Sequence, residues 1–414
     1  MTPLKLRADL FAFLKQNRNW LTAGALLSLL SSFGQTYFIS IFAAEIQADF
    51  GLSHGGWGAT YALGTMASAA TMIWAGSLTD VFRARTLGVL IFGMLAVACV
   101  AMALNPYAAL LPVVIFALRL TGQGMCSHIA VVSMARWFVA TRGRALSVAS
   151  LGFAMGEAML PIVFVALLNL FHWRSLWVVA AIIALAGIPI LLALLRTERT
   201  PQSMANENQS AGMGGAHWTR KAALRHPLFW FMFPAILGPS AFNTAFFFHQ
   251  VYFAGLKDWS HLSLVALFPL YTAMAIVAMI ASGIALDRFG TARLIPIYQL
   301  PMVVAFTIFA LSGSLTHAAL GFVFLALTTG ANSTLPNAFW AEFYGTRHIG
   351  SIKAMATAVM VLGSAIGPGV TGVLIDAGVD LNTQYMGVSV YFLFASLCTW
   401  IGINRYRHML ARSA

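Results

Sequence analysis

The sequence predicts an all-α polytopic membrane protein with twelve transmembrane helices in two pseudo-symmetric six-helix bundles. Three observations predict it: the composition, a series of long apolar runs and an internal repeat. Of the 414 residues, 60% are hydrophobic and only 9% are charged, and the mean hydropathy is +0.81. Water-soluble domains carry about 25% charged residues. Lipid is therefore the solvent that suits most of this chain.

Apolar runs long enough to cross a bilayer recur along the whole sequence. Each run of about 20 residues spans roughly 30 Å of hydrocarbon as an α-helix. Backbone in lipid must satisfy its own hydrogen bonds, so the spans should be helices, and none shows the alternating pattern of a membrane strand. We expect spans at residues 20–42, 56–79, 86–105, 109–134, 145–170, 175–195, 227–254, 263–286, 294–314, 318–344, 352–376 and 385–404.

The positive charges predict the orientation of these spans. With the N-terminus in the cytoplasm, every Lys and Arg falls on the cytoplasmic side except Arg119, Arg174 and Lys257. This distribution follows the positive-inside rule. We therefore expect both termini in the cytoplasm and the protein in a plasma membrane, the inner membrane of a bacterium. The net charge of +12 then reflects topology, and we expect no nucleic-acid partner.

A polar stretch at residues 196–226 divides the spans into six and six. It is rich in Gly, Ser, Asn and Gln, a composition typical of a flexible linker. We expect an N-terminal bundle at residues 1–195, a cytoplasmic linker at residues 196–226 and a C-terminal bundle at residues 227–414.

The two halves share short motifs in register, which predicts a duplicated six-helix unit. The loop "GSLTDVFRAR" follows the second span and "GIALDRFGTAR" follows the eighth, with the same spacing from Gly to Asp. Further positions also recur: Gln35 and Thr36 match Asn243 and Thr244, and Gly152 and Gly156 match Gly363 and Gly367.

Twelve spans, a central linker and G-x-x-x-D-(R/K)-x-G-type loops after spans two and eight resemble the major facilitator superfamily. The second loop matches the family pattern at Gly283, Asp287, Arg288 and Gly290. The first loop departs from it, because Val81 follows Asp80 and Arg83 stands where glycine is usual. The resemblance implies a secondary active transporter that works by alternating access.

The resemblance also implies a cytoplasmic gate built from charged helix ends. Partly wet ion pairs there are worth about 0–1 kcal/mol each, which suits contacts that must break. The alternative is plain loop charge that serves only topology. The expected gate residues are Gly76, Asp80, Arg83, Arg142, Arg144, Gly283, Asp287, Arg288, Glu342 and Arg347.

Arg119 in span four and Glu157 in span five are the one base and the one acid placed at membrane depth. A charge at the bilayer centre costs about 2.5–3.5 kcal/mol. The spans are antiparallel neighbours, and the two residues differ in depth by about 6 Å, so a salt bridge is within reach. Either the pair only fixes helix packing, or Arg119 attracts an anionic substrate while Glu157 carries a proton.

Buried amides should point inward, because lipid would leave them without partners. They either touch substrate or bond between helices. Gln123 and Cys126 share the face of Arg119 at α-helical spacing, whereas His128 points away and is expected to pack. The expected substrate and proton-coupling residues are Arg119, Glu157, Gln123, Gln35, Asn243, Gln250 and Asn332.

These residues predict proton-coupled transport of a small organic anion, a carboxylate, by a monomer embedded in the lipid bilayer. The alternative is a proton-driven efflux antiporter of amphipathic, drug-like compounds, favoured by the aromatic content. By the family resemblance, Glu157 replaces the proline of an antiporter pattern, which argues against that exporter. A membrane enzyme or a sensor is disfavoured, because the sequence holds no nucleophile–base cluster, metal set or nucleotide loop. We expect no cofactor or metal, and Cys99, Cys126 and Cys398 fit packing roles.

Overall fold

The computed structural model describes residues 3–76, 78–138, 141–197, 211–345 and 348–410, with the side chains of 3–11, 80, 142–143 and 349–351 left out. Over these residues the chain is helical, joined by turns and without a strand. It divides into two units. Unit 1 contains Met1–Glu45 and Leu63–Asn206, and unit 2 contains Ile46–Ala62 and Glu207–Ala414.

The first ten α-helices precede the polar stretch at 196–226. They are α1 Pro3–Leu30, α2 Thr36–Ile39, α3 Ala43–Phe50, α4 His54–Ala75, α5 Leu78–Val81, α6 Ala84–Leu104, α7 Leu111–Leu118, α8 Ser127–Trp137, α9 Arg142–Leu168 and α10 Trp173–Leu194. Between them lie the 3-10 helices η1 Ser31–Gly34, η2 Ser40–Phe42 and η3 Ala108–Leu110, and the π-helix η4 Arg119–Cys126.

The remaining helices lie in unit 2. They are α11 Arg220–Arg225, α12 Pro227–Phe248, α13 Gln250–Leu256, α14 His261–Val265, α15 Phe268–Phe289, α16 Thr291–Leu294, α17 Leu300–Leu311, α18 Leu315–Asn332, α19 Leu335–Tyr344, α20 Ile349–Asp376 and α21 Leu381–Tyr406. Two 3-10 helices complete the unit, η5 Met213–Gly215 and η6 Arg407–Met409.

Each predicted span coincides with one helix or with a series of consecutive helices. Within the described residues, nine helices are long and apolar enough to cross a membrane, or ten when the bent pair at 12–34 and 36–50 counts as one span. That pair bends by 47°. The two other ranges hold α4, which is rich in Gly, Ser and Thr, and α17, which has only 12 residues. Twelve membrane crossings stay a prediction.

Several spans that read as continuous in the sequence are broken in the structure. In the first span, α1 ends at Leu30 and the 3-10 helix η1 ends at Gly34, because Gln35 is extended, with φ −86° and ψ 153°. The seventh is interrupted at His249, and the tenth at Ser333 and Thr334, just before Pro336 at the start of α19. Proline lacks the backbone donor and suits only the first turn of a helix, so the tenth break follows from the sequence.

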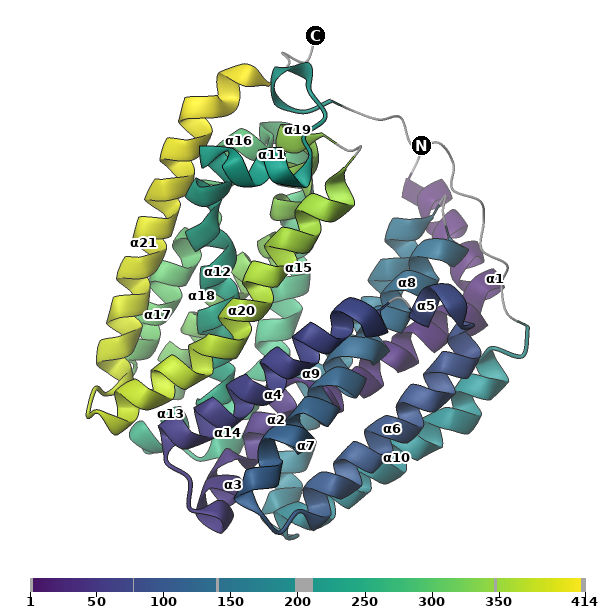
Figure 1. Cartoon of the computed structure of the whole chain (residues 1–414), viewed down its shortest axis with the longest axis vertical. Helices are drawn as coiled ribbons and strands as arrows, with labels where there is room; N and C mark the ends of the chain where they lie inside the picture. The colour runs from purple at the N-terminus through teal and green to yellow at the C-terminus, as the bar shows by residue number, and fades with distance from the viewer. Residues whose placement is uncertain (1–2, 77, 139–140, 198–210, 346–347, 411–414) are drawn as a thin grey trace. The chain divides into compact units, whose positions relative to one another are not determined.

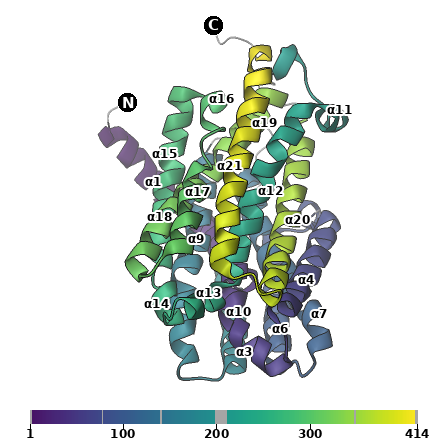
Figure 2. The same ribbon diagram turned by 90° about the vertical axis from the view of Figure 1, so that its left-hand side faces the viewer.

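Helix pairing repeats between the halves of the chain. In unit 1, α1 packs on α9 and α6 on α10, and in unit 2, α12 packs on α20 and α17 on α21. The neighbouring ribbons are visible in Figures 1 and 2. An added Cβ at Gly152 would overlap the carbonyl oxygen of Ala25, and one at Gly367 would overlap that of Ala241. Glycine at these recurring positions therefore lets α9 and α20 approach their partners closely.

The second half of the polar stretch packs against the helices of unit 2, to which it belongs, in contrast to the flexible linker that its composition predicts. The side chain of Met213 is fully buried in a cluster with Phe343 and Tyr344 of α19. Trp218 accompanies it: its indole Nε1 donates to the carbonyl of Met213 at 3.1 Å, and its backbone N–H donates to that of Tyr344 at 3.2 Å. The composition of the whole stretch is polar, so it does not reveal the two apolar residues, Met213 and Trp218, that anchor its second half.

Unit 2 also holds the start of α4. The Asp376 carboxylate at the end of α20 accepts the backbone N–H groups of His54 at 3.1 Å and Gly55 at 2.8 Å. It thereby caps the first turn of α4, where four donors lack helical partners. The His54 ring lies 4.5 Å from the ring of Tyr252 and 6.2 Å from that of His249.

Acidification is expected to loosen this cap. Burial lowers the pKa of His54 from its ordinary 6.5, and the Asp376 charge offsets part of the shift. The state in which the start of α4 has left the Asp376 cap therefore binds more protons than the capped state. The cap is most stable above pH 6.5, and this stability is lost as the pH falls through the lower pKa that His54 has in the capped state. Amide hydrogen exchange at His54 and Gly55, corrected for intrinsic rates, should be faster at pH 5 than at pH 7.5.

A second carboxylate cap serves as the matched control for this pH effect. The Asp380 carboxylate accepts the backbone N–H of Thr383 at 3.0 Å, and this bond helps to lower the pKa of Asp380. Protection of the Thr383 amide should therefore change little over the same pH range. A His54→Phe variant keeps an aromatic ring without the titrating group, and a pH effect that persists in it would contradict the assignment.

Candidate functional site

Arg119 begins the π-helix η4, between α7 and α8. Its side chain is only 1% exposed. In a π-helix the backbone bonds run from i to i+5, which widens the turn, so residues seven apart no longer share a face as they do in an α-helix. The sequence argument that grouped Gln123 and Cys126 with Arg119 assumed α-helical spacing. In the structure Cys126 is fully buried and Gln123 is half-buried.

The guanidinium of Arg119 reaches the break after η1. Its Nη1 donates to the carbonyl of Gly34 at 3.1 Å and to the Thr36 hydroxyl at 3.4 Å. The carbonyl is available because Gln35 leaves the helical conformation. The break in the first span therefore creates an acceptor for the buried cation.

Glycines bring the two elements of this contact together. A Cβ at Gly34 would overlap the carbonyl of Leu118, and a Cβ at Gly122 would lie 2.6 Å from the Cα of Gly34. Gln35 is buried beside this contact. The structure thus gathers Arg119, Gln35 and the backbone of Gln123 around one glycine pair in unit 1.

Glu157 is half-buried on α9, beside the glycine that faces η1. The Tyr37 hydroxyl donates to Ser32 at 2.8 Å and interacts electrostatically with Glu157. A Cβ at Gly156 would overlap the Ser32 hydroxyl. The carboxylate therefore belongs to the polar cluster around the η1–α2 break, and a direct Arg119–Glu157 ion pair stays a prediction.

Unit 2 contains a separate polar cavity of about 170 Å³. It brings together Asn243 and Asn332, which the sequence proposed independently. Its lining residues are Pro239, Ser240, Asn243, Thr244, Thr329 and Asn332, from α12 and α18. Gln250 is fully buried at the start of α13, beyond the break at His249, and does not belong to this lining.

A hydrogen-bond network orients the cavity wall. The Asn243 amide Nδ2 donates to the hydroxyls of Tyr271 and Thr329, both at 3.4 Å, and the Tyr271 hydroxyl donates to Thr329 at 3.3 Å. The side-chain Oδ1 of Asn332 accepts the hydroxyl of Tyr298 at 3.3 Å. Among the described residues, the buried Oδ1 of Asn243 has no hydrogen-bond donor.

The loop after α4 is held by α8. His128 Nε2 lies 3.1 Å from the carbonyl of Gly76, and Arg136 donates to the carbonyl of Thr79 at 2.6 Å. His128 therefore packs between helices, as expected. Arg83 and Arg144 are exposed, and the side chains of Asp80 and Arg142 lie outside the described residues.

The loop after α15 is built differently. Gly290 ends that helix with φ +73°, a left-handed conformation that favours glycine. Asp287 and Arg288 are exposed, and the Glu342 carboxylate accepts the hydroxyl of Thr291 at the start of α16.

The other two predicted gate residues of this half give less information. An added Cβ at Gly283 would meet no other atom within 4 Å. Arg347 lies outside the described residues. Gate function stays a prediction for the whole set.

Sequence reasoning missed the hydroxyl groups that complete both polar clusters. Ser32, Tyr37, Tyr271 and Thr329 all bond to, or lie beside, predicted site residues. Serine, threonine and tyrosine are common in membrane helices, so the residue type alone does not mark a site residue. Thr36 was the exception, because it stands next to Gln35 in a motif that recurs as Asn243 and Thr244.

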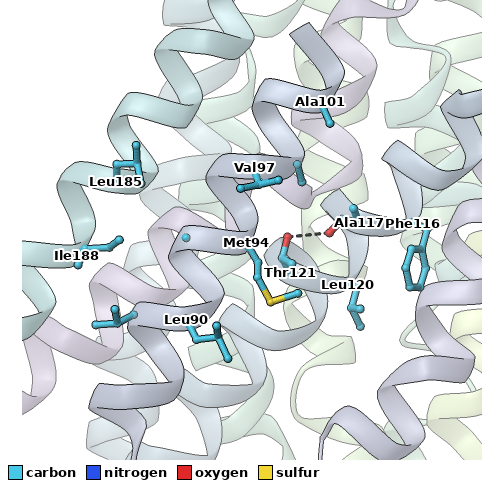
Figure 3. Close-up of a pocket in the computed structure, with 13 residues that line it drawn as sticks. Leu90, Met94, Val97, Ala101, Phe116, Ala117, Leu120, Thr121, Leu185 and Ile188 are labelled. Carbon is cyan, nitrogen blue, oxygen red and sulfur yellow. Dashed lines mark hydrogen bonds between the residues drawn. The ribbon is translucent and has the colours of Figure 1, made fainter. Parts of the chain in front are cut away.

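Unit 1 also has an apolar pocket of about 730 Å³ between α6, α7, η4 and α10. Figure 3 shows side chains such as Leu90, Met94 and Val97 along its wall. The hydroxyl of Thr121 donates to the carbonyl of Ala117 at 2.7 Å, as the dashed line marks. The polar group in this wall is thus satisfied within its own helix, and the pocket suits an apolar ligand.

Comparisons with known proteins agree with this architecture. The family model described as Major Facilitator Superfamily matches residues 24–368. The comparison with curated proteins finds no match.

Solved structures share the fold at low sequence identity. A bacterial homologue of the human lysosomal transporter Spinster, in an inward-facing and unoccupied conformation, is 16% identical with a TM-score of 0.75, covering 96% of this chain and 99% of that one. The nucleoside transporter NupG is 14% identical with a TM-score of 0.69, covering 94% of this chain and 99% of that one.

The family match covers most of the chain, and the full length of these transporters superposes on it. The matched family and the apolar spans identify a multi-pass membrane transporter rather than an enzyme. The chain belongs to the Major Facilitator Superfamily.

Proposed function

We propose that the protein is a secondary active transporter that moves a small organic anion, a carboxylate, together with protons. The observation that carries the proposal is the buried position of Arg119, whose guanidinium is held by a carbonyl and a hydroxyl at the η1–α2 break. An arginine fork matches a carboxylate geometrically, which suits this buried cation to an anionic substrate.

Glu157 supplies the proton-coupling part of the proposal. It lies in the same polar cluster, beside Tyr37 and Ser32. Burial disfavours an ionised carboxylate, so proton uptake by Glu157 would free Arg119 to bind the substrate anion. The two events would then favour each other, which is the requirement for symport.

The remaining parts of the proposal concern topology and gating. We place both termini in the cytoplasm and the protein in a bacterial inner membrane, acting as a monomer with bundles at residues 1–195 and 227–414. The basic residues at the predicted cytoplasmic ends support this orientation. The loops after α4 and α15, with Glu342 on α19, form the proposed cytoplasmic gate.

The alternative is a proton-driven efflux antiporter of amphipathic compounds. The apolar pocket in unit 1 favours it, because about 730 Å³ falls within the range of roughly 300–1,000 Å³ typical of small-molecule sites. A cationic amphipathic substrate would be repelled by Arg119, so substrate charge separates the two functions.

The test is uptake of labelled small carboxylates into proteoliposomes, with and without an inwardly directed proton gradient. We expect gradient-driven accumulation in the wild type and its loss in Glu157→Gln, because an amide cannot carry the coupled proton. Asp380→Asn, which changes an exposed helix cap, is the matched control. Absence of carboxylate uptake under every gradient would contradict the proposal and favour the antiporter.

A further inference from the structure

We propose that the apolar pocket between α6, α7, η4 and α10 holds one acyl chain of an anionic phospholipid, whose phosphate is bound by Arg85 and Arg196. The pocket and both arginines belong to unit 1. Such a lipid is a bound component of the membrane rather than the transported solute, so this site is independent of the proposed function.

The pocket offers apolar contact and no hydrogen bond. Three side chains of its α6 wall are exposed, Leu90 by 57%, Met94 by 44% and Val97 by 69%. Because α6 and α10 are each long and apolar enough to cross a membrane, exposed apolar side chains along them face lipid. Among the described lining residues, Thr121 alone has a polar side chain, and its hydroxyl donates to the carbonyl of Ala117. The pocket therefore suits a hydrocarbon.

The pocket is long, which favours a chain over a compact solute. On α6 its lining extends from Val89 to Ala101, about 18 Å at 1.5 Å per residue. This length is comparable with the roughly 15 Å of hydrocarbon in one leaflet. Figure 3 shows Met94 and Leu185, from α6 and α10, in this wall. A Cβ added at Gly93, between them in the lining, would meet no other atom within 4 Å, so the groove is open there.

Glycine contacts define the antiparallel register of α6 and α10. A Cβ added at Gly88 would lie 2.6 Å from Cδ2 of Leu191, and one added at Gly187 would lie 3.2 Å from Cε2 of Phe92. The two contacts step in opposite directions along the helices. The same register places Arg85 level with the last turn of α10.

Two arginines therefore lie at one end of the groove. Arg85 is exposed in the first turn of α6, four residues before Val89 and on the same helix face. Arg196 is exposed just beyond the end of α10. Trp20 of α1 lies at the same level, because its indole Nε1 donates to the carbonyl of Thr197 at 2.8 Å. Tryptophan is enriched where headgroups meet hydrocarbon, so the arginines stand at headgroup depth.

The charge of this end selects among phospholipids. Neither α6 nor α10 contains Asp or Glu, so the two helices supply no anion of their own. Arginine binds phosphate oxygens through charge-assisted hydrogen bonds. A zwitterionic lipid brings an ammonium group that the arginines repel, whereas phosphatidylglycerol brings only the negative charge. We expect the site to prefer phosphatidylglycerol over phosphatidylethanolamine by at least about tenfold.

The test uses the purified full-length protein in phosphatidylcholine nanodiscs. A trace of phosphatidylglycerol carries a photoactivatable group on one acyl chain, and peptide mass spectrometry locates the label after illumination. We expect label on the lining residues of α6 and α10, with unlabelled phosphatidylglycerol competing at least about tenfold better than phosphatidylethanolamine. Gly93→Leu, which fills the groove, should remove this label. The double variant Arg85→Gln, Arg196→Gln should abolish the preference between the two competitors.

Matched controls lie on α21 of unit 2. Gly387→Leu adds a side chain where a new Cβ also meets no other atom within 4 Å, and Arg405→Gln removes an exposed arginine from the last turn. Both should keep the wild-type label and preference. Equal competition by the two lipids, or label that persists in Gly93→Leu, would overturn the site and leave only ordinary boundary lipid.

Two other occupants would also overturn the site. Label displaced by an amphipathic cation but not by phosphatidylglycerol would assign the pocket to a solute of the efflux alternative. A groove labelled in nanodiscs that hold one copy of the protein, and protected in those that hold two, would assign it to a second copy of the chain.

Discussion

Arg119→Gln is expected to lower uptake of small carboxylates about 100-fold or more. Removing one partner of a buried, charge-assisted contact costs about 2–5 kcal/mol, and 1.4 kcal/mol corresponds to a factor of ten. Glutamine keeps a donor for the Gly34 carbonyl, which Arg119 contacts at 3.1 Å, so the helix packing should suffer less than the attraction for an anion. Initial rates of uptake into proteoliposomes measure the loss.

Arg174→Gln is the matched control for this variant. Arg174 also lies in unit 1, and its guanidinium donates to the carbonyls of Ala103 at 3.1 Å and Asn105 at 2.6 Å. If both variants lost uptake equally and in proportion to folded protein, Arg119 would have only a packing role. Arg119→Lys keeps the charge without the planar fork and should retain part of the uptake. Full activity of Arg119→Gln would contradict the proposal.

Gly152→Val is expected to prevent folding of unit 1 or to destabilise it severely. Overpacking in a well-packed interior typically costs about 1–3 kcal/mol. Here the cost should exceed that range, because the new Cβ would overlap the carbonyl oxygen of Ala25 in α1, and a backbone atom cannot rotate away. Thermal unfolding and the yield of monodisperse protein in detergent measure the effect.

Gly387→Val, on α21, is the control for this packing effect. An added Cβ there would meet no other atom within 4 Å, so the variant tests valine in a membrane helix without the clash. Wild-type stability of Gly152→Val would mean that α1 and α9 tolerate a wider separation. Gly367→Val, which faces Ala241 in the equivalent pair, should behave like Gly152→Val.

The membrane fold was predictable because it depends on properties that accumulate along the chain. Apolar runs predict where each membrane helix lies, and glycines at recurring positions mark the helices that pack closely, α1 with α9 and α12 with α20. The breaks at Gln35 and His249 were not predictable, since neither residue is a helix breaker. Both are local conformations fixed by packing against other helices.

Site residues that are costly to bury could be predicted from the sequence, whereas site residues that bury at little cost could not. Arg119 and Asn243 stand out in an apolar run because each needs partners. The π-helix that carries Arg119 gives no sequence signal, so the assignment of Cys126 to the face of Arg119 rested on the wrong helical period. The hydroxyl partners Tyr271 and Thr329 become visible only once the fold brings them beside Asn243.

The packing of Met213 and Trp218 against α19 determines where the chain can be divided. A C-terminal half that began at Pro227, where the first helix of that half starts, would lack both anchors. Its surface at Phe343 and Tyr344 would then be open to solvent and prone to self-association. Split-protein complementation and half-molecule expression should therefore place the cut before Gly212, so that the segment travels with the helices it covers.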